Sequence, residues 1–157
     1  MSSFEAFFRD YYDETVRAVA LAIGSRDRAE EVVQEAFAKA YSRWRLVRMM
    51  DRPGAWLYVV ALNAERTRWR RERKDGSAPA VQTCEPDRTG TVLTSVLLRD
   101  AIDRLSPRQR AAVVLRYAAD LTVGEIALAM DCAEGTVKAT LHQALRALRV
   151  DLGGDEL

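Results

Sequence analysis

The chain has 157 residues, of which 48% are hydrophobic and 30% charged, with 24 Lys and Arg against 23 Asp and Glu. This balance is typical of a globular protein, and the lack of any apolar run of about 18 residues excludes a transmembrane helix. The N-terminal residues lack the basic and then apolar order of a signal peptide, so we expect a cytoplasmic protein.

Metal, disulfide and catalytic chemistry are not expected. Cys84 and Cys132 are far apart, with no CxxC motif, and His142 is the only histidine. No glycine-rich phosphate loop and no Ser/His/Asp pattern is present. We therefore expect no cofactor, no metal and no enzymatic activity. Cys132 is interpreted as a core residue; Cys84, in a polar stretch, is interpreted as an exposed thiol, with a redox role as the alternative.

Apolar side chains at helical spacing predict three helices in the first part of the chain. The first covers residues 4–23 and ends at Gly24, and the second covers residues 29–44. The third begins at Pro53, a favourable first helical residue. Its expected core stripe is Trp56, Val59, Val60, Asn63 and Thr67. These three helices can share one core.

The third helix ends in a basic run. Between Arg66 and Lys74, six basic residues stand against one acid, Glu72, and Trp69 is interleaved with the arginines. One interpretation is a solvated helix end that complements the helix dipole. The other is a surface for unpaired bases, where an aromatic ring stacks and guanidinium groups bind phosphates. Asn63 is likewise either a core amide or a base contact.

Residues 75–92 are rich in Gly, Pro, Ser and Asp and show no apolar period. This composition indicates a flexible linker. The predicted fold is therefore all-α, with one small helical domain at residues 1–74 and a second at residues 93–152.

The second domain should begin with a helix and continue with two capped helices. Ser106 with Gln109, and Thr122 with Glu125, form capping-box patterns, the first with Pro107 at the first helical position. The expected core residues of these segments are Val96, Leu97, Ala101, Leu105, Ala111, Val114, Leu115 and Ala118.

The last helix is expected from Glu134 to about Val150, after a short turn. A helix, a tight turn and a second helix form a helix-turn-helix, whose second helix enters the DNA major groove. The alternative is an ordinary amphipathic helix with a solvated face. Residues 95–157 carry eight basic and nine acidic side chains, so this domain alone should bind DNA weakly. Opposite the core stripe lie Gly135, Ala139, His142, Gln143 and Arg146, with Lys138 and Arg149 on the flanks.

Several segments together resemble one family. Residues 27–41 (DRAEEVVQEAFAKAY) resemble the core-binding helix of bacterial sigma factors, and residues 52–63 (RPGAWLYVVALN) resemble their −10 segment. The motifs LSPRQR, VLRY, EIA and GTVK, in this order, resemble the domain that reads the −35 element. The order and the linker resemble the two-domain extracytoplasmic-function (ECF) group of sigma factors.

The resemblance implies an initiation factor that binds core RNA polymerase and directs promoter recognition. Residues 1–74 would be sigma region 2 and residues 93–152 sigma region 4. The partners implied are the coiled coil of the largest polymerase subunit, promoter DNA and an anti-sigma protein, with the chain itself a monomer.

The resemblance also assigns residues. The residues implied for the −35 element lie on the last helix: Gly135, Thr136, Lys138, Ala139, His142, Gln143 and Arg146. The residues implied for polymerase binding are Glu30, Glu31, Gln34, Glu35, Phe37 and Tyr41. The residues implied for the melted −10 strand are Arg48, Arg52, Asn63, Arg66, Trp69 and Arg70.

The chain departs from the family pattern at the start of the last helix. Ala133 stands where Ser or Asp usually caps, and Ala139-Thr140 replaces Ser-Arg. These changes keep two alternatives open: a stand-alone helix-turn-helix regulator, and a decoy that binds an anti-sigma protein.

Overall fold

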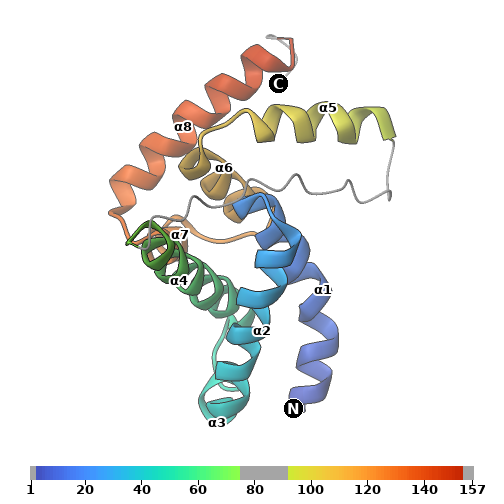
Figure 1. Cartoon of the computed structure of the whole chain (residues 1–157), viewed down its shortest axis with the longest axis vertical. Coiled ribbons are helices and arrows are strands. Elements are labelled where there is room, and N and C mark those ends of the chain that lie inside the picture. The colour runs from blue at the N-terminus through green and yellow to red at the C-terminus, as the bar shows by residue number, and fades with distance from the viewer. Residues whose placement is uncertain (1–2, 75–91, 154–157) are drawn as a thin grey trace.

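The structure of the protein is a computed structural model that describes residues 3–74 and 92–153 (Figure 1). These ranges contain helices and turns without a strand, which confirms the all-α prediction. No helix within them is long and apolar enough to cross a membrane. The N-terminal half contains α1 (Phe4–Ile23), α2 (Arg26–Ser42), α3 (Trp44–Val47) and α4 (Pro53–Lys74). The C-terminal half contains α5 (Val92–Asp103), α6 (Pro107–Val113), the π-helix η1 (Val114–Ala118), α7 (Val123–Met130) and α8 (Glu134–Asp151).

Local signals set the break between α1 and α2. Gly24 ends α1 with a φ of 80°, a left-handed conformation that glycine adopts without steric cost. The next residue, Ser25, is the N-cap of α2, and its hydroxyl accepts a hydrogen bond from the Arg28 backbone N–H at 3.3 Å. The predicted break at residues 24 and 25 is confirmed.

The core of the N-terminal half lies between α1, α2 and α4, which pack against one another. The expected core stripe of α4 was wrong: Asn63 and Thr67 are exposed, and Trp56, Val59 and Val60 are only partly buried. The reason is that α4 packs on α2 and on α7, so a different set of positions is covered. The buried residues of α4 are Ala55, Leu57, Tyr58, Ala61, Leu62 and Ala64.

The core of the C-terminal half is formed mainly by α6, α7 and α8. Ala101 and Leu105 are buried as expected, but Val96 and Leu97 of α5 are 39% and 55% exposed, so that part of the expectation was wrong. The physical reason is that α5 makes few contacts with the other described helices, mostly with α8.

The end of α6 departs from α-helical geometry. In η1 the Ala119 backbone N–H donates to the Val114 carbonyl at 3.0 Å, five residues back, as in a π-helix. The wider turn changes which of the following residues point toward the core. Val114 and Leu115 are buried as expected, whereas Ala118 is exposed, contrary to the expectation.

The two halves pack against each other in a closed arrangement. α7 packs along α4, while α6 and η1 pack on α1 (Figure 1). α8 lies on the outer side of the C-terminal half, away from α2 and α3 (Figure 1). The helix-turn-helix therefore presents its second helix outward and its first helix to the N-terminal half.

Candidate nucleic-acid interface

The helix-turn-helix consists of α7, a turn at residues 131–133 and α8. Thr122 caps α7: its hydroxyl accepts from the Glu125 N–H at 3.1 Å, and the Glu125 carboxylate accepts from the Thr122 N–H at 2.9 Å. Asp131 ends α7 in the left-handed region, with a φ of 54°. Ala133, the N-cap of α8, makes no side-chain cap hydrogen bond. The predicted capping box at Thr122 and Glu125 and the predicted lack of a side-chain cap at Ala133 are thus confirmed.

The outer face of α8 is free of contacts that would hide it. Val137, Leu141, Ala144 and Leu148 are buried against the rest of the C-terminal half. A Cβ atom placed on Gly135 would meet no atom within 4 Å, so the protein's own packing does not require a glycine there. All seven residues predicted to contact DNA are exposed: Gly135, Thr136, Lys138, Ala139, His142, Gln143 and Arg146.

Two of the arginines predicted to bind the −10 strand contact the C-terminal half instead. Arg52 forms an ion pair with Glu125, and its Nη2 donates to the Asp120 carbonyl at 2.6 Å. Arg66 donates to the carbonyl of Ala129, in the last turn of α7. A guanidinium at a helix C-terminus satisfies an orphan carbonyl and complements the helix dipole.

Arg66 also donates to the side-chain oxygen of Asn63, which joins two residues of the predicted −10 set. Asn63 is exposed, so its interpretation as a core amide is wrong. Burial lowers the pKa of the Arg66 guanidinium below its ordinary value, and the charge of Asp131 opposes this.

The other three members of the −10 set are exposed. Arg48 follows α3, and Arg70 lies near the end of α4. The Trp69 side chain is 40% exposed, with the Arg73 guanidinium 4.4 Å from its ring centroid, a cation–π contact within one helix. Arg52 and Trp69 are separated by about 25 Å along the helix axis at about 1.5 Å per residue. The set therefore follows the length of α4 rather than a single pocket.

The polar residues of α2 predicted to bind polymerase are accessible, and most have intramolecular partners. Glu31 pairs with Arg68 of the basic run, and Glu30 pairs with Arg26 at 3.3 Å. The amide of Gln34 donates to the Tyr12 hydroxyl at 3.4 Å. Glu35 and Lys39 form an i,i+4 pair at 4.0 Å.

The two aromatic residues of that set differ. Tyr41 is 69% exposed, with its ring 5.1 Å from that of Phe4. Phe37 is only 2% exposed, so its assignment as a contact residue is wrong. The helical period places Phe37 on the inner stripe of α2, where its ring packs against Phe7, Phe8 and Tyr12.

One group of surface residues was missed from the sequence. Leu46, in α3, and Met49 and Met50, between α3 and α4, are exposed around Arg48. The sequence did carry a signal for this group, because these large apolar side chains lie outside any predicted helical stripe. Exposed apolar residues beside cationic ones suit a partner with a flat apolar face and a negative charge, such as an unstacked nucleotide with its phosphate.

The cysteines give no further site. Cys132 is partly buried and packs on the core. Cys84 lies outside the described residues. Within the described ranges, no group of three or more His, Cys, Asp or Glu side chains is placed to hold a metal ion.

In a comparison with known proteins, two family models match the chain, one over its N-terminal half and one over its C-terminal half. The model for Sigma-70 region 2 matches residues 7–75, and that for Sigma-70, region 4 matches residues 95–148.

Individual relatives match nearly the whole chain. The RNA polymerase sigma-E factor of Streptomyces coelicolor is 34% identical over 157 residues, covering 98% of this chain and 88% of that protein. The ECF RNA polymerase sigma factor SigL of Mycobacterium tuberculosis is 36% identical over 158 residues, covering 94% and 89%. The sigma factor RpoE from Bartonella quintana, in a co-crystal structure with the anti-sigma factor NepR, shares the fold over 98% of both chains, with a TM-score of 0.79 at 24% identity.

Proposed function

The chain belongs to the ECF group of bacterial RNA polymerase sigma factors, and from this premise we propose how its two halves divide the work of an alternative sigma factor. Residues 1–74 act as region 2, residues 75–92 as a linker, and residues 93–152 as region 4. Sigma factors are generally non-catalytic, and we propose no catalytic residue.

Region 4 binds the −35 element through α8. The observation that supports this is the outer face of α8, where small residues, Gly135 and Ala139, lie beside side chains that bind phosphates or base edges. Lys138 and Arg146 suit phosphates, while His142 and Gln143 suit base edges. The absent cap at Ala133 leaves backbone N–H groups at the start of α8 available to a phosphate.

Region 2 binds the melted −10 strand along α4 and the preceding segment. Its contact residues are Arg48, Arg52, Asn63, Arg66, Trp69 and Arg70, with the exposed Leu46, Met49 and Met50 beside them. The accessible residues of α2 bind the largest polymerase subunit: Glu30, Glu31, Gln34, Glu35 and Tyr41. Phe37 supports that helix from within the core.

Initiation requires the closed arrangement to open. The −10 and −35 elements lie about 25 base pairs apart, which at about 3.4 Å per base pair is roughly 85 Å. In the closed arrangement, Arg52 and Arg66 of region 2 bind atoms of α7 directly. One face of α4 therefore cannot contact DNA until α7 has left it. Polymerase supplies the free energy for this opening.

A regulatory partner is also proposed. The structural relative from Bartonella quintana was crystallised with an anti-sigma factor. We expect a protein of this class to bind the present chain, which we expect to be monomeric without it.

Run-off transcription tests the proposed function. Purified core polymerase is combined with this chain as the sole initiation factor on a library of promoter fragments from its own genome. Discrete transcripts support the proposal. Polymerase binding without transcripts supports a decoy, and no polymerase binding supports a stand-alone regulator; either result overturns the proposal. The double variant Glu31→Lys, Glu35→Lys should lose polymerase binding. The control variant Glu5→Lys, at an exposed position on α1, should keep it.

A further inference from the structure

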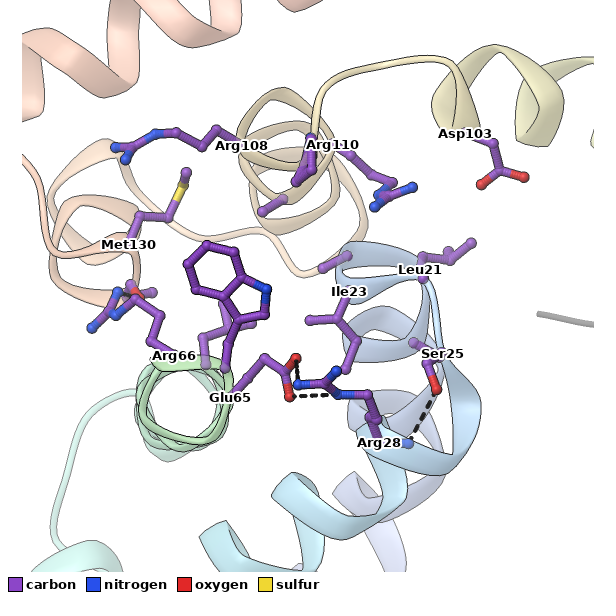
Figure 2. A pocket seen from close by; sticks show the side chains of 18 of the residues that line it. Leu21, Ile23, Ser25, Arg28, Glu65, Arg66, Asp103, Arg108, Arg110 and Met130 are labelled. Carbon is purple, nitrogen blue, oxygen red and sulfur yellow. Dashed lines mark hydrogen bonds and ion pairs between the residues drawn. The ribbon is translucent and has the colours of Figure 1, made fainter. Parts of the chain in front are cut away.

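A cavity of about 610 Å³ lies between the two halves (Figure 2). Its walls come from the end of α1 and from α4 on one side, and from α6 and α7 on the other. Figure 2 shows Ile23 and Leu21 facing Arg110 of α6, with Met130 across the opening from them. This volume is in the range of about 300–1,000 Å³ typical of small-molecule sites.

The walls are mainly apolar. They include the side chains of Leu21, Ile23, Leu62, Trp69, Ala111 and Met130. An apolar cavity this large between two packed halves lacks the dispersion contacts of a filled core. A ligand with an aliphatic body would supply them.

The charged groups of the cavity are predominantly cationic. Five arginines line it, against two acids, Glu65 and Asp103. Arg28 and Glu65 pair with each other at 2.6 Å, which leaves four arginines against Asp103. The cavity therefore favours an anion over a cation.

One of these arginines, Arg110, is available to a ligand. Within the described part of the chain, no hydrogen bond or ion pair joins Arg110 to another group, and its Nε is buried without an acceptor. A buried donor without an acceptor costs about 1–3 kcal/mol, or more for a charged group. A shift of the Arg110 side chain toward an anionic oxygen in the cavity would remove that cost and form a charge-assisted hydrogen bond.

We propose that this cavity binds a small anion with an aliphatic body, of the class of a medium-chain fatty carboxylate. The chain of the ligand packs against Leu21, Ile23 and Met130, and its carboxylate accepts hydrogen bonds from the Arg110 guanidinium, which lies on the Leu21 side of the opening in Figure 2. A nucleotide fits less well because the walls offer few groups for base edges beyond Ser25. The site shares Arg66 and Trp69 with the proposed −10 surface and is otherwise distinct from the DNA-binding and polymerase-binding surfaces.

A consequence follows for regulation, and it rests on the proposed function. Because both halves form the walls, the ligand binds only the closed arrangement and shifts the population toward it. Since opening is required for initiation, the ligand lowers transcription.

The first test uses the free full-length chain without polymerase or DNA, so its outcome does not depend on the proposed function. Decanoate, below its micelle-forming concentration, is titrated by calorimetry, with decyltrimethylammonium as the matched cation. We expect saturable binding of decanoate alone, with a Kd raised about tenfold by Arg110→Gln and unchanged by Arg9→Gln, at an exposed position on α1. Should Arg110→Gln unfold the chain, as judged by circular dichroism, Ala111→Asp, which places a like charge on the cavity wall, replaces it with the same expectation.

The proposal would be overturned by no binding of decanoate, by equal binding of the cation, or by binding that the cavity variant leaves unaffected. Binding of ATP in place of decanoate would also overturn the assigned ligand class. In the second test, decanoate should reduce run-off transcription by the unsubstituted chain and have less effect on Arg110→Gln. Saturable binding without that difference would retain the site and refute its regulatory consequence.

Discussion

Arg52 and Glu125 join the two halves of the protein through one carboxylate oxygen. Oε1 of Glu125 accepts a hydrogen bond from the Thr122 backbone N–H, which caps α7, and the same atom contacts Nη1 of Arg52. The first helix of the helix-turn-helix is thus fixed at its start and held to α4 by the same side chain. A residue that we propose to bind the −10 strand is thereby occupied by region 4.

Glu125→Gln should weaken the closed arrangement without removing the cap. Gln serves as well as Glu at the third position of a capping box, but it lacks the charge that pairs with Arg52. A partly exposed ion pair contributes about 0.2–1 kcal/mol, so the open population should rise by up to about fivefold. Small-angle X-ray scattering should show a larger radius of gyration, and the affinity for a −10 single strand should increase.

The matched control for that experiment is Glu5→Gln on α1, which also removes one exposed carboxylate. It should leave the radius of gyration unchanged. If Glu125→Gln and Glu5→Gln behave alike, the Arg52–Glu125 pair does not contribute to closure.

Lys138→Ala with His142→Ala should weaken binding to the −35 element. Both side chains lie on the exposed face of α8. Loss of one phosphate contact and one base contact should cost about fivefold or more in affinity and reduce the salt dependence by about one phosphate. Fluorescence anisotropy with a promoter fragment recovered from run-off transcription measures both. Affinity equal to that of the Arg9→Ala control would show that this face does not bind DNA.

Ala133→Ser should stabilise the start of α8. The Ala133 backbone is extended, with a φ of −74° and a ψ of 153°, as a capping serine requires, and it has no side-chain acceptor at present. A restored cap contributes about 1 kcal/mol, which corresponds to about 2–4 °C in Tm for a chain of this size. Ala139→Ser, inside the same helix, should slightly lower the Tm. A Tm that is unchanged or lower for Ala133→Ser would contradict the position of the helix start.

Glu65 should make the stability depend on pH. Burial raises the pKa of the Glu65 carboxyl above its ordinary value, with Arg28 opposing and Glu72 adding to the increase. The folded chain therefore binds this proton more readily than the unfolded chain does. The resulting stability is fully present below the unfolded pKa and is lost as the pH rises through the folded pKa.

The variant Glu65→Gln removes this dependence. The free energy of unfolding of the unsubstituted chain, minus that of Glu65→Gln, should become more positive as the pH falls from 7 to 4. Urea unfolding at several pH values measures it, with the exposed Glu35→Gln as control. A difference that stays constant or decreases toward acid would refute the assigned direction.

The sequence was sufficient where the signals were local. The caps at Ser106 and Thr122, the break at Gly24 and the inner stripe of α8 all depend on residues within a few positions of one another, and the structure has them as predicted. The burial of Ala118 and of the α4 stripe was mispredicted because a π-helical turn and the packing of α7 on α4 set these faces. Neither feature has a local pattern.

The candidate site divides in the same way. The outer face of α8 follows from helical periodicity alone, and so, in retrospect, does the burial of Phe37. The partners of Arg52 and Arg66 in the C-terminal half did not follow from the sequence, because each lies more than sixty positions away along the chain. Long-range ion pairs have no sequence period that would reveal them.

The distance between region 2 and region 4, with and without promoter, tests the central claim most directly. Spin labels at Thr67→Cys on α4 and Leu128→Cys on α7, both exposed positions, are introduced into a chain with Cys84→Ser and Cys132→Ala. Double electron–electron resonance should give a short distance between the two labels in the free chain. In the complex with core polymerase and promoter, that distance should be longer by tens of ångströms. A short distance in a transcriptionally active complex would contradict the claim that α7 must leave α4 before initiation.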